Sequence, residues 1–426
     1  MSVAERIYRA VDEKQAEIVK LLRKLVQIPT PTPPGLNYDR IVEIMLPYFT
    51  SMGFQARRID LPEQVFHQRC KAIHPELEGA RSNLLANFKK GKKETVLWYA
   101  HIDTVPVNES RWTIPPYRGL IKDGRIWGRG TSDNKGGCAA VIAAFRILYE
   151  LGLEPKSNVV VALTSDEEVG PYSGLMYLAD EGYFKDCQYF HCLDGSSEGI
   201  GIGANGTITW SLTIKGESAH SGESFLGINP IEHSFGVLEQ LLKLKGKVEL
   251  RKSRMPVAPK IADETGMLTV IPLLNITMAR GGLKHNIVPS EFILEGDRRL
   301  IPEEEESQVI REIQDAVNKA QARDPKLKYE LKTTPSYPSF FQDPNHPWVQ
   351  KVKRAAELVS GEKLSVFGSG GSTDVAYIVK ATQMKVASYG TSRHKESGIH
   401  GENENVRIGD LLNLVKCVAI LATELA

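Results

Sequence analysis

Acidic residues and histidine directly follow three strand-like runs of the sequence. Residues 96–100, 159–164 and 189–193 are apolar runs of strand length, and each leads into side chains that can bind a metal or carry a proton. Open α/β sheets bind their ligands at the carboxyl ends of the strands, so side chains in these positions can converge on one site. In chain order they are His101, Asp103, Glu167, Glu168 and Asp194.

Two further segments supply side chains of the same kind. The glycine-rich stretch 128–137 has Asp133 near its centre and leads into an apolar helix, and His400 opens the sequence His-Gly-Glu-Asn-Glu near the C-terminus. A lone histidine or acid at the end of a strand usually belongs to a structural pair, and adjacent glutamates are usually a solvated edge. Several such groups at the mouth of one sheet favour a metal site.

The ligand types indicate which metal ions would bind. Imidazole and carboxylate ligands without thiolates suit divalent ions of the zinc type. A catalytic zinc ion keeps three protein ligands and an open water position. A set of five ligands, made of two histidines, two aspartates and one glutamate, is therefore too many for one ion. They fit two ions that lie about 3.5–4 Å apart and share one carboxylate.

The neighbouring glutamates can then have different roles. In an extended segment adjacent side chains point in opposite directions, so one of Glu167 and Glu168 can bind metal while the other holds the water as general base. We expect Asp103 to bond the distal ring nitrogen of His101 and thereby to fix the tautomer of the imidazole.

Four segments of the chain carry a resemblance to a known family. Residues 99–106, 128–137, 164–170 and 400–404 resemble the signatures of a family of co-catalytic zinc peptidases and deacylases. That family contains acetylornithine deacetylase, succinyl-diaminopimelate desuccinylase, aminoacylase-1, glutamate carboxypeptidase and carnosinase-type dipeptidases. The resemblance covers essentially the whole chain, and it concerns the family rather than any one member.

The resemblance implies a role for each ligand. Asp133 would bridge the two ions, which would be zinc, with cobalt or manganese as substitutes. Glu167 would be the general base. The remaining ligands would divide between the two positions, with His101 and Asp194 at one ion and Glu168 and His400 at the other.

The resemblance also implies an inserted lid domain that forms a homodimer. His220 would reach the active site of the partner subunit, and Asn286 and Arg299 of the same lid would contact the substrate. Without the resemblance, His220 would be interpreted as a surface residue of a loop.

A glycine-rich segment near the C-terminus also matches the family. In residues 368–374 the backbone N–H groups around Gly370 and Gly371 could form a nest that accepts the substrate's carboxylate. The alternative interpretation is a tight turn before the helix that we expect over residues 375–379.

The residue at position 194 departs from the pattern of the deacylases. The deacylases of the family typically have glutamate at this position, whereas its aminopeptidases and dipeptidases often have aspartate, as here in Asp194. Two kinds of amide hydrolase therefore stay open. One is an N-acyl amino acid deacylase or exopeptidase similar to the deacetylase and desuccinylase, and the other is a dipeptidase or aminopeptidase.

Two other classes of protein can be weighed against the sequence. Residues 201–206 satisfy the GxGxxG pattern of a dinucleotide-binding oxidoreductase, but an alternating strand rather than a helix follows them, so a hinge between domains is the better interpretation. A non-catalytic metal-binding scaffold is disfavoured because no ligand position and no candidate base has been lost.

Composition excludes several partners. The 53 Lys and Arg residues against 52 Asp and Glu residues leave a net charge of +1, which argues against a nucleic-acid or membrane-surface protein. No apolar run approaches the length of a membrane span. Five scattered cysteines without a CxxC pair argue against a disulfide framework. We therefore expect a cytoplasmic protein, and the resemblance implies an enzyme whose small-molecule or short-peptide substrate carries a carboxylate.

The elements that must position these residues predict an α/β fold. Strand patterns alternate with helical patterns along the chain, and this order favours a mainly parallel sheet with helices on both faces. The expected strands are at 83–88, 95–100, 158–164, 189–193 and 385–389, and the helices include one around residues 18–26 and a buried one at 138–148. Between residues 206 and 337 the order is βαββαβ, with a helix starting at Pro302, which is typical of a ferredoxin-like module. We therefore expect a catalytic domain of residues 1–205 and 338–426, with the lid inserted at 206–337.

Overall fold

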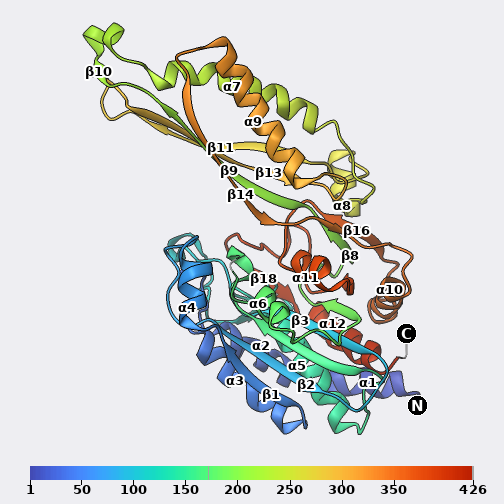
Figure 1. Ribbon diagram of the computed structural model, residues 1–426. Coiled ribbons are helices and arrows are strands. Elements are labelled where there is room, and N and C mark those ends of the chain that lie inside the picture. The colour runs from blue at the N-terminus through green and yellow to red at the C-terminus, as the bar shows by residue number, and fades with distance from the viewer. Residues whose placement is uncertain (171, 425–426) are drawn as a thin grey trace. The chain divides into compact units, whose positions relative to one another are not determined.

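The structure is a computed structural model that describes residues 1–170 and 172–424, and the chain divides into two compact units (Figure 1). The first unit comprises Met1–Ile202, Gln342–Phe367 and Tyr377–Ala426, and the second comprises Gly203–Phe341 and Gly368–Ala376. One segment differs from the sequence-based expectation, which placed all residues after 337 in the first unit. Residues 368–376 belong to the second unit, where Gly368 N–H donates to Pro256 O over 2.8 Å and Asn205 N–H donates to Ser369 O over 3.0 Å.

The first unit is built on a mixed sheet whose centre is parallel. The central strands are β6 (Asn158–Thr164), β3 (Thr95–His101), β7 (Tyr189–Cys192) and β17 (Lys385–Ser388), in that order and all parallel. Three further strands flank them: β2 (Ser82–Phe88) runs antiparallel to β6, β1 (Gln55–Asp60) runs antiparallel to β2, and β8 (Gly199–Ala204) runs antiparallel to β17. Every residue of β3 and β6 is buried, which explains their unbroken apolar runs. The mainly parallel α/β sheet expected from the sequence is confirmed.

Long helices pack against this sheet. The longest of them, α5 (Lys135–Glu150), is buried along most of its length and packs on β3, where the rings of Trp98 and Phe145 meet edge to face at 5.7 Å. The others are α1 (Val3–Glu13), α2 (Gln15–Val26), α3 (Tyr38–Ser51), α10 (Pro347–Ser360) and α12 (Ile408–Ala422). Within the described part of the chain, no helix combines the length and the apolar character needed to cross a membrane.

The second unit contains a four-stranded antiparallel sheet. Its spatial order is β11 (Leu273–Gly281), β13 (Glu291–Leu300), β9 (Gly206–Lys215) and β14 (Lys328–Tyr337). Two long helices, α7 (Pro230–Val248) and α9 (Glu306–Arg323), cover the sheet and share its apolar core, to which Leu212, Leu241 and Ile313 belong. Along the chain the main elements run β9-α7-β11-β13-α9-β14.

The start of α9 was predicted wrongly. We expected the helix to begin at Pro302, with the following glutamates against its positive end. It begins at Glu306 instead, and the preceding acids are engaged elsewhere: Glu304 forms ion pairs of 2.6 Å with Arg251 and Arg298, and Glu303 accepts a hydrogen bond from Ser253. These contacts account for Glu303 and Glu304, whereas Glu305 at the N-cap and Glu306 in the first turn lie at the positive end of the helix.

Candidate metal centre

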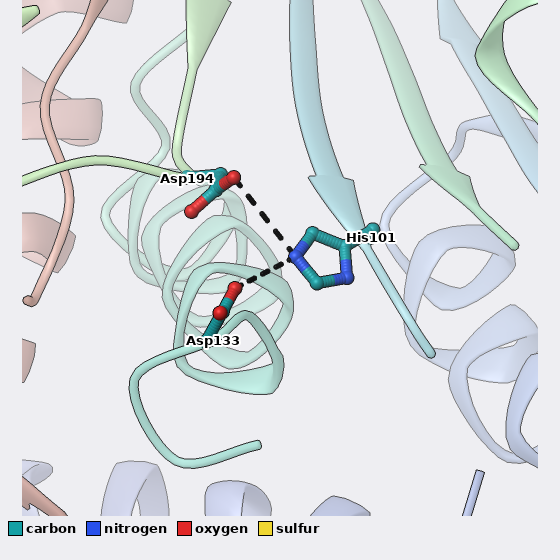
Figure 2. A group of neighbouring side chains, drawn as sticks. All are labelled: His101, Asp133 and Asp194. Atoms are coloured by element: carbon teal, nitrogen blue, oxygen red, sulfur yellow. Dashed lines mark hydrogen bonds and ion pairs between the residues drawn. The ribbon is translucent and has the colours of Figure 1, made fainter. Parts of the chain in front are cut away.

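Five potential metal ligands converge at the carboxyl end of the parallel sheet. They form two groups, and within each group the ligand atoms lie within 4.8 Å of one another. The first group is His101, Asp133 and Asp194 (Figure 2), and the second group is Asp133, Glu168 and His400.

The local elements explain this convergence. His101 is the last residue of β3, while Asp194 follows the end of β7 and Glu168 follows β6. Asp133 lies in the loop that leads into α5, and His400 lies in a turn near the C-terminus. Because β3, β6 and β7 are parallel, their carboxyl ends meet at one edge of the sheet.

Asp133 belongs to both groups, and its two oxygen atoms face different histidines. Its Oδ1 lies 2.9 Å from His101 Nε2, and its Oδ2 lies 3.1 Å from His400 Nε2. A second carboxylate approaches the same nitrogen of each imidazole, with Asp194 Oδ2 3.9 Å from His101 Nε2 (Figure 2) and Glu168 Oε2 2.8 Å from His400 Nε2. A carboxylate that faces two separate ligand groups has the arrangement of a bridge between two ions.

The other ring nitrogen of His101 faces Asp103. His101 Nδ1 lies 3.2 Å from the backbone oxygen of Asp103 and 3.5 Å from its carboxylate Oδ1. A proton on Nδ1 would be held by these acceptors, which leaves Nε2 as the nitrogen directed at Asp133 and Asp194. This contact agrees with the orienting role that we expected for Asp103.

Burial and charge shift the pKa values of the site in opposite directions. Burial, together with the charge of Asp133, raises the pKa of Glu168 to about 7 and that of Asp194 to about 6. Hydrogen bonds with Asp133 and Glu168 raise the pKa of His400 to about 10. Burial opposes ionisation of Asp133, but its bonds to His101 and His400 outweigh burial and lower its pKa. Such crowded carboxylates compete for protons, and a divalent cation can take the place of those protons.

The glutamate pair does not lie in an extended segment, so that part of the prediction was wrong. Glu167 to Val169 form a single 3₁₀ turn, and the preceding Asp166 has a φ of 63°. The carboxylate of Asp103 accepts the backbone N–H of Glu167 over 3.2 Å and that of Glu168 over 3.1 Å. Asp103 therefore contacts both the histidine of one group and the turn that carries a ligand of the other.

Glu404 is a residue of the site to which the sequence analysis gave no role. It is fully buried, and its carboxylate accepts hydrogen bonds from the backbone N–H groups of Gly130, Ser132 and Asp133 at 3.0, 2.9 and 3.1 Å. Arg129 Nη1 lies 2.7 Å from the same carboxylate. Glu404 thus holds the loop of Asp133 against the turn of His400, and its position in the His400 motif was the only signal in the sequence.

The substrate-binding residues predicted from the resemblance form two clusters within the second unit. His220 ends β10 (Ala219–His220), which pairs with β12 (Ile287–Val288), so that Asn286 lies beside it. His220 is exposed and its Nδ1 accepts the N–H of Gly222 over 3.1 Å, whereas Asn286 Oδ1 is buried without a hydrogen-bond partner among the described residues.

The second cluster joins Arg299 to the glycine-rich segment. Arg299 Nη1 donates to Thr207 Oγ1 over 2.9 Å and to Ser372 Oγ over 3.1 Å. Gly370 and Gly371 are exposed, and the N–H of Gly371 already donates to Ser369 Oγ over 2.9 Å. The segment thus combines a turn before α11 (Val375–Thr382) with a hydroxyl that lies beside a guanidinium group.

The dinucleotide-binding alternative fails on local structure. Residues 201–206 span the end of β8 and the start of β9, so a strand follows the glycines and no helix N-terminus is available for a pyrophosphate.

The site and the sheet together define the class of protein. Two groups of imidazole and carboxylate ligands that share one aspartate, at the carboxyl end of a parallel sheet, are typical of hydrolases that use two metal ions. The comparison with protein families defines a narrower class, because the sequence model of Peptidase family M20/M25/M40 matches residues 97–424. The chain belongs to this family, as the resemblance indicated, and it is a metal-dependent hydrolase of amide bonds.

Individual relatives differ in the reactions for which they are named. The chain is 23% identical to N-formyl-4-amino-5-aminomethyl-2-methylpyrimidine deformylase of Halalkalibacterium halodurans, over 98% of this chain and 96% of the relative. It is 28% identical to succinyl-diaminopimelate desuccinylase of Psychromonas ingrahamii, over 77% and 82%. The crystal structure of human carnosine dipeptidase 1 shares the fold, with a TM-score of 0.78 and 19% identity over 100% of this chain and 99% of that one.

Proposed function

We propose that the protein uses two Zn²⁺ ions to hydrolyse the amide bond of a small substrate that carries a free carboxylate. The observation that supports this most directly is the position of Asp133, whose two oxygens face the separate groups of His101 and His400. The donor set of imidazole and carboxylate suits Zn²⁺, and Co²⁺ or Mn²⁺ could replace it. His101 and Asp194 would hold one ion, and Glu168 and His400 would hold the other. Asp133 would bind both ions.

The chemistry divides between the ions and Glu167. When bound, the ions lower the pKa of a coordinated water and polarise the scissile carbonyl. The Glu167 carboxylate would take up the proton that the attacking water loses and deliver it to the leaving nitrogen. Its neighbours support this role, because Asp103 holds the backbone N–H groups of both Glu167 and Glu168 and so fixes the turn.

The substrate's carboxylate would bind to the cluster around Arg299. A guanidinium group binds carboxylates through charge-assisted hydrogen bonds. Arg299 pairs through Nε with Asp297 and donates through Nη1 to Thr207 and Ser372, so its Nη2 would be the donor to the substrate. The exposed backbone of Gly370 would add a further donor, and the absence of side chains at Gly370 and Gly371 would allow close approach of the substrate.

Two substrate classes fit this arrangement. Desuccinylase and deformylase relatives support a deacylase of N-acyl amino acids or related amides, whereas Asp194 supports a dipeptidase or aminopeptidase. A hydrolysis panel of N-acetyl and N-succinyl amino acids against unblocked dipeptides separates them. Cleavage of blocked compounds alone would establish a deacylase, and a requirement for a free amine would establish a peptidase. Failure to cleave any member with zinc bound would contradict the proposal.

Metal binding should weaken as the pH falls. The pKa of Glu168 is about 7, that of Asp194 about 6 and that of His400 about 10, and each group must lose its proton to bind metal. Because protons and Zn²⁺ compete for these atoms, we expect the affinity to fall at least about 100-fold between pH 7.5 and 5.5. Titration of metal-free protein with Zn²⁺ at both pH values measures this change, and an affinity independent of pH would contradict the assigned ligands.

We further propose that the second unit is a ferredoxin-like lid through which two copies form a dimer. Its βαββαβ order and its antiparallel sheet support the first part. Exposed apolar side chains support the second, since Phe235 and Leu242 on α7 are 67% and 57% exposed and Met278 on β11 is 47% exposed. Phe235 and Leu242 are seven residues apart and so lie on one face of α7, and exposed apolar side chains that adjoin one another are typical of interfaces.

In such a dimer His220 would act in the partner's active site. Its imidazole, with Asn286 beside it, would donate a hydrogen bond to the oxyanion that forms during attack. Since the loss of one oxyanion donor typically costs about 100- to 1,000-fold in turnover, His220→Ala should lower kcat by this factor and leave the metal content unchanged. His233→Ala, a histidine of the same unit that pairs with Asp324, serves as the matched control and should retain turnover.

Mixed dimers test whether His220 of one subunit acts in the active site of the other. Subunits with His220→Ala and subunits with Glu167→Ala are each nearly inactive alone. After subunit exchange, a heterodimer combines both defects in one site and leaves the other site intact, so part of the activity should return. A monomeric protein with full activity, or mixtures that stay inactive despite proven exchange, would remove this proposal and leave the metal chemistry unaffected.

We place the enzyme in the cytoplasm because all five cysteines are buried free thiols, as is usual in a reducing compartment.

A further inference from the structure

Asp166, which immediately precedes the proposed base, carries a buried carboxylate surrounded by donors. Its Oδ1 accepts hydrogen bonds from Thr32 Oγ1 over 3.1 Å and from Tyr38 Oη over 2.7 Å. Its Oδ2 accepts a hydrogen bond from the Ser173 hydroxyl and forms an ion pair of 2.7 Å with Arg81 Nε. The side chains of Asp166 and Arg81 are both fully shielded from solvent. A carboxylate held from four directions has little freedom to move.

Arg81 is itself fixed by the chain around it. Its Nη1 donates to Glu78 O over 2.6 Å and to Gly35 O over 3.2 Å, and its Nη2 donates to Pro34 O over 2.7 Å. The backbone closes tightly over the guanidinium group, because a Cβ at Gly35 would lie 2.4 Å from Nη1 and the φ of this glycine is +93°. Arg81 therefore ties Asp166 to the loop between α2 and α3 and to the segment before β2.

The turn of the proposed base is thereby held from two sides. Asp166 has a φ of 63°, so its backbone sets the direction in which the chain leaves β6 and enters Glu167. Asp103 accepts the N–H groups of Glu167 and Glu168 at the other side of the same turn. A shift of the turn would move the Glu167 carboxylate relative to the metal ligands, and a displacement near 1 Å can cost about 100-fold in rate.

We propose that Asp166, anchored by Arg81 and Tyr38, is a positioning residue that sets the place of the Glu167 carboxylate. This inference rests on the proposed role of Glu167 as general base. Among the described residues, the hydrogen bonds and the ion pair of the Asp166 carboxylate go to Thr32, Tyr38, Ser173 and Arg81, and none of these is a proposed metal ligand. It acts on the reaction through the backbone of the turn.

Asp166→Asn tests the inference, because it keeps the shape of the side chain and removes the charge that faces Arg81. At saturating Zn²⁺ we expect kcat to fall about 10- to 100-fold while KM changes little and two ions per chain remain bound. Tyr38→Phe removes a single donor and leaves the ion pair in place, so its loss of kcat should be smaller and its fold intact. The Tyr38→Phe variant therefore still tests the inference if the Asp166→Asn variant does not fold.

A double-mutant cycle separates positioning from a merely structural role. In the Glu167→Ala background there is no base to position, so adding Asp166→Asn or Tyr38→Phe should change the residual rate less than about threefold. Asn158→Ala provides the control, because Asn158 sits at the opposite end of β6 in a buried network with the backbone of Lys90 and Lys92. It should lower the melting temperature and leave kcat unchanged.

The outcomes distinguish this inference from the proposed function. Equal losses of kcat in both backgrounds, or an unchanged kcat in folded Asp166→Asn and Tyr38→Phe, would overturn the positioning role while Glu167 remained the base. A Glu167→Ala variant with near wild-type turnover would overturn the proposed function itself.

Discussion

Replacing Glu167 by alanine should lower kcat about 1,000-fold while both metal ions stay bound, since a positioned general acid–base group contributes about 10²- to 10⁴-fold to rate. Glu167 belongs to neither of the two ligand groups, so its removal leaves all five ligand side chains in place. The turn should also keep its shape, because Asp103 binds the backbone N–H of this residue rather than its side chain. Turnover and metal content, measured on the same preparation, check the prediction.

Glu168→Ala is the matched control for this experiment. Glu168 lies in the same turn and its N–H is held by the same Asp103 carboxylate, but its side chain approaches His400 Nε2 to 2.8 Å. We therefore expect this variant to lose metal together with activity. If Glu167→Ala loses metal in the same way, Glu167 is a ligand rather than the base. If it turns over at the wild-type rate, another group removes the proton.

Much of the first unit was predictable because its signals are local. The apolar runs that form β3 and β6 are continuous, since parallel strands at the centre of a sheet are buried on both faces. The nearly all-round apolar sequence of α5 likewise indicates a buried helix. One local signal was overlooked: Ser2 and Glu5 form a capping box at the start of α1, and Ile7 and Val11 recur at helical spacing.

Four of the five candidate ligands could be proposed from the sequence because they stand at the carboxyl end of a strand or in a glycine-rich loop. His400 has neither position and was proposed from its own short motif. Of the residues that support these ligands, Asp103 was predicted, whereas the others could not be predicted. The environment of Asp166 depends on Arg81 and Tyr38, which are distant in sequence, and no local pattern predicts that these side chains meet. The same applies to Glu404, whose partners are backbone N–H groups of a loop far earlier in the chain. Nearly every residue has a backbone N–H, so the residue types do not indicate which of these groups will donate to a side chain.

The boundary of the second unit was missed for a related reason. Residues 368–376 run from the end of β16 (Ser365–Ser369) into the start of α11, and the sequence pattern assigns this connection to the first unit. Their place is set by backbone hydrogen bonds to Pro256 and Asn205 and by the contact of Ser372 with Arg299. The resemblance assigned Arg299 and the glycine segment separately to the substrate, and the structure shows that both lie in one cluster of the second unit.

Asp133→Ala should abolish metal binding at both positions, in contrast to a change at any ligand of a single group. Each oxygen of Asp133 faces a different histidine, at 2.9 and 3.1 Å, so its removal takes an anionic ligand from both ions at once. Loss of a group that only orients a ligand costs about 10- to 100-fold in metal affinity, and we expect the loss of the shared ligand to exceed about 100-fold at both positions.

Asp194→Ala supplies the comparison, because Asp194 belongs only to the group of His101. We expect wild-type protein to retain two Zn²⁺ ions per chain after dialysis, Asp194→Ala to retain one and Asp133→Ala to retain neither. The loop of Asp133 should stay folded, since Glu404 binds its backbone N–H rather than its carboxylate. If Asp133→Ala retained one ion, the two groups would not share this ligand. The assignment of a dinuclear centre would then be wrong, and the protein would have two independent sites or bind a single ion.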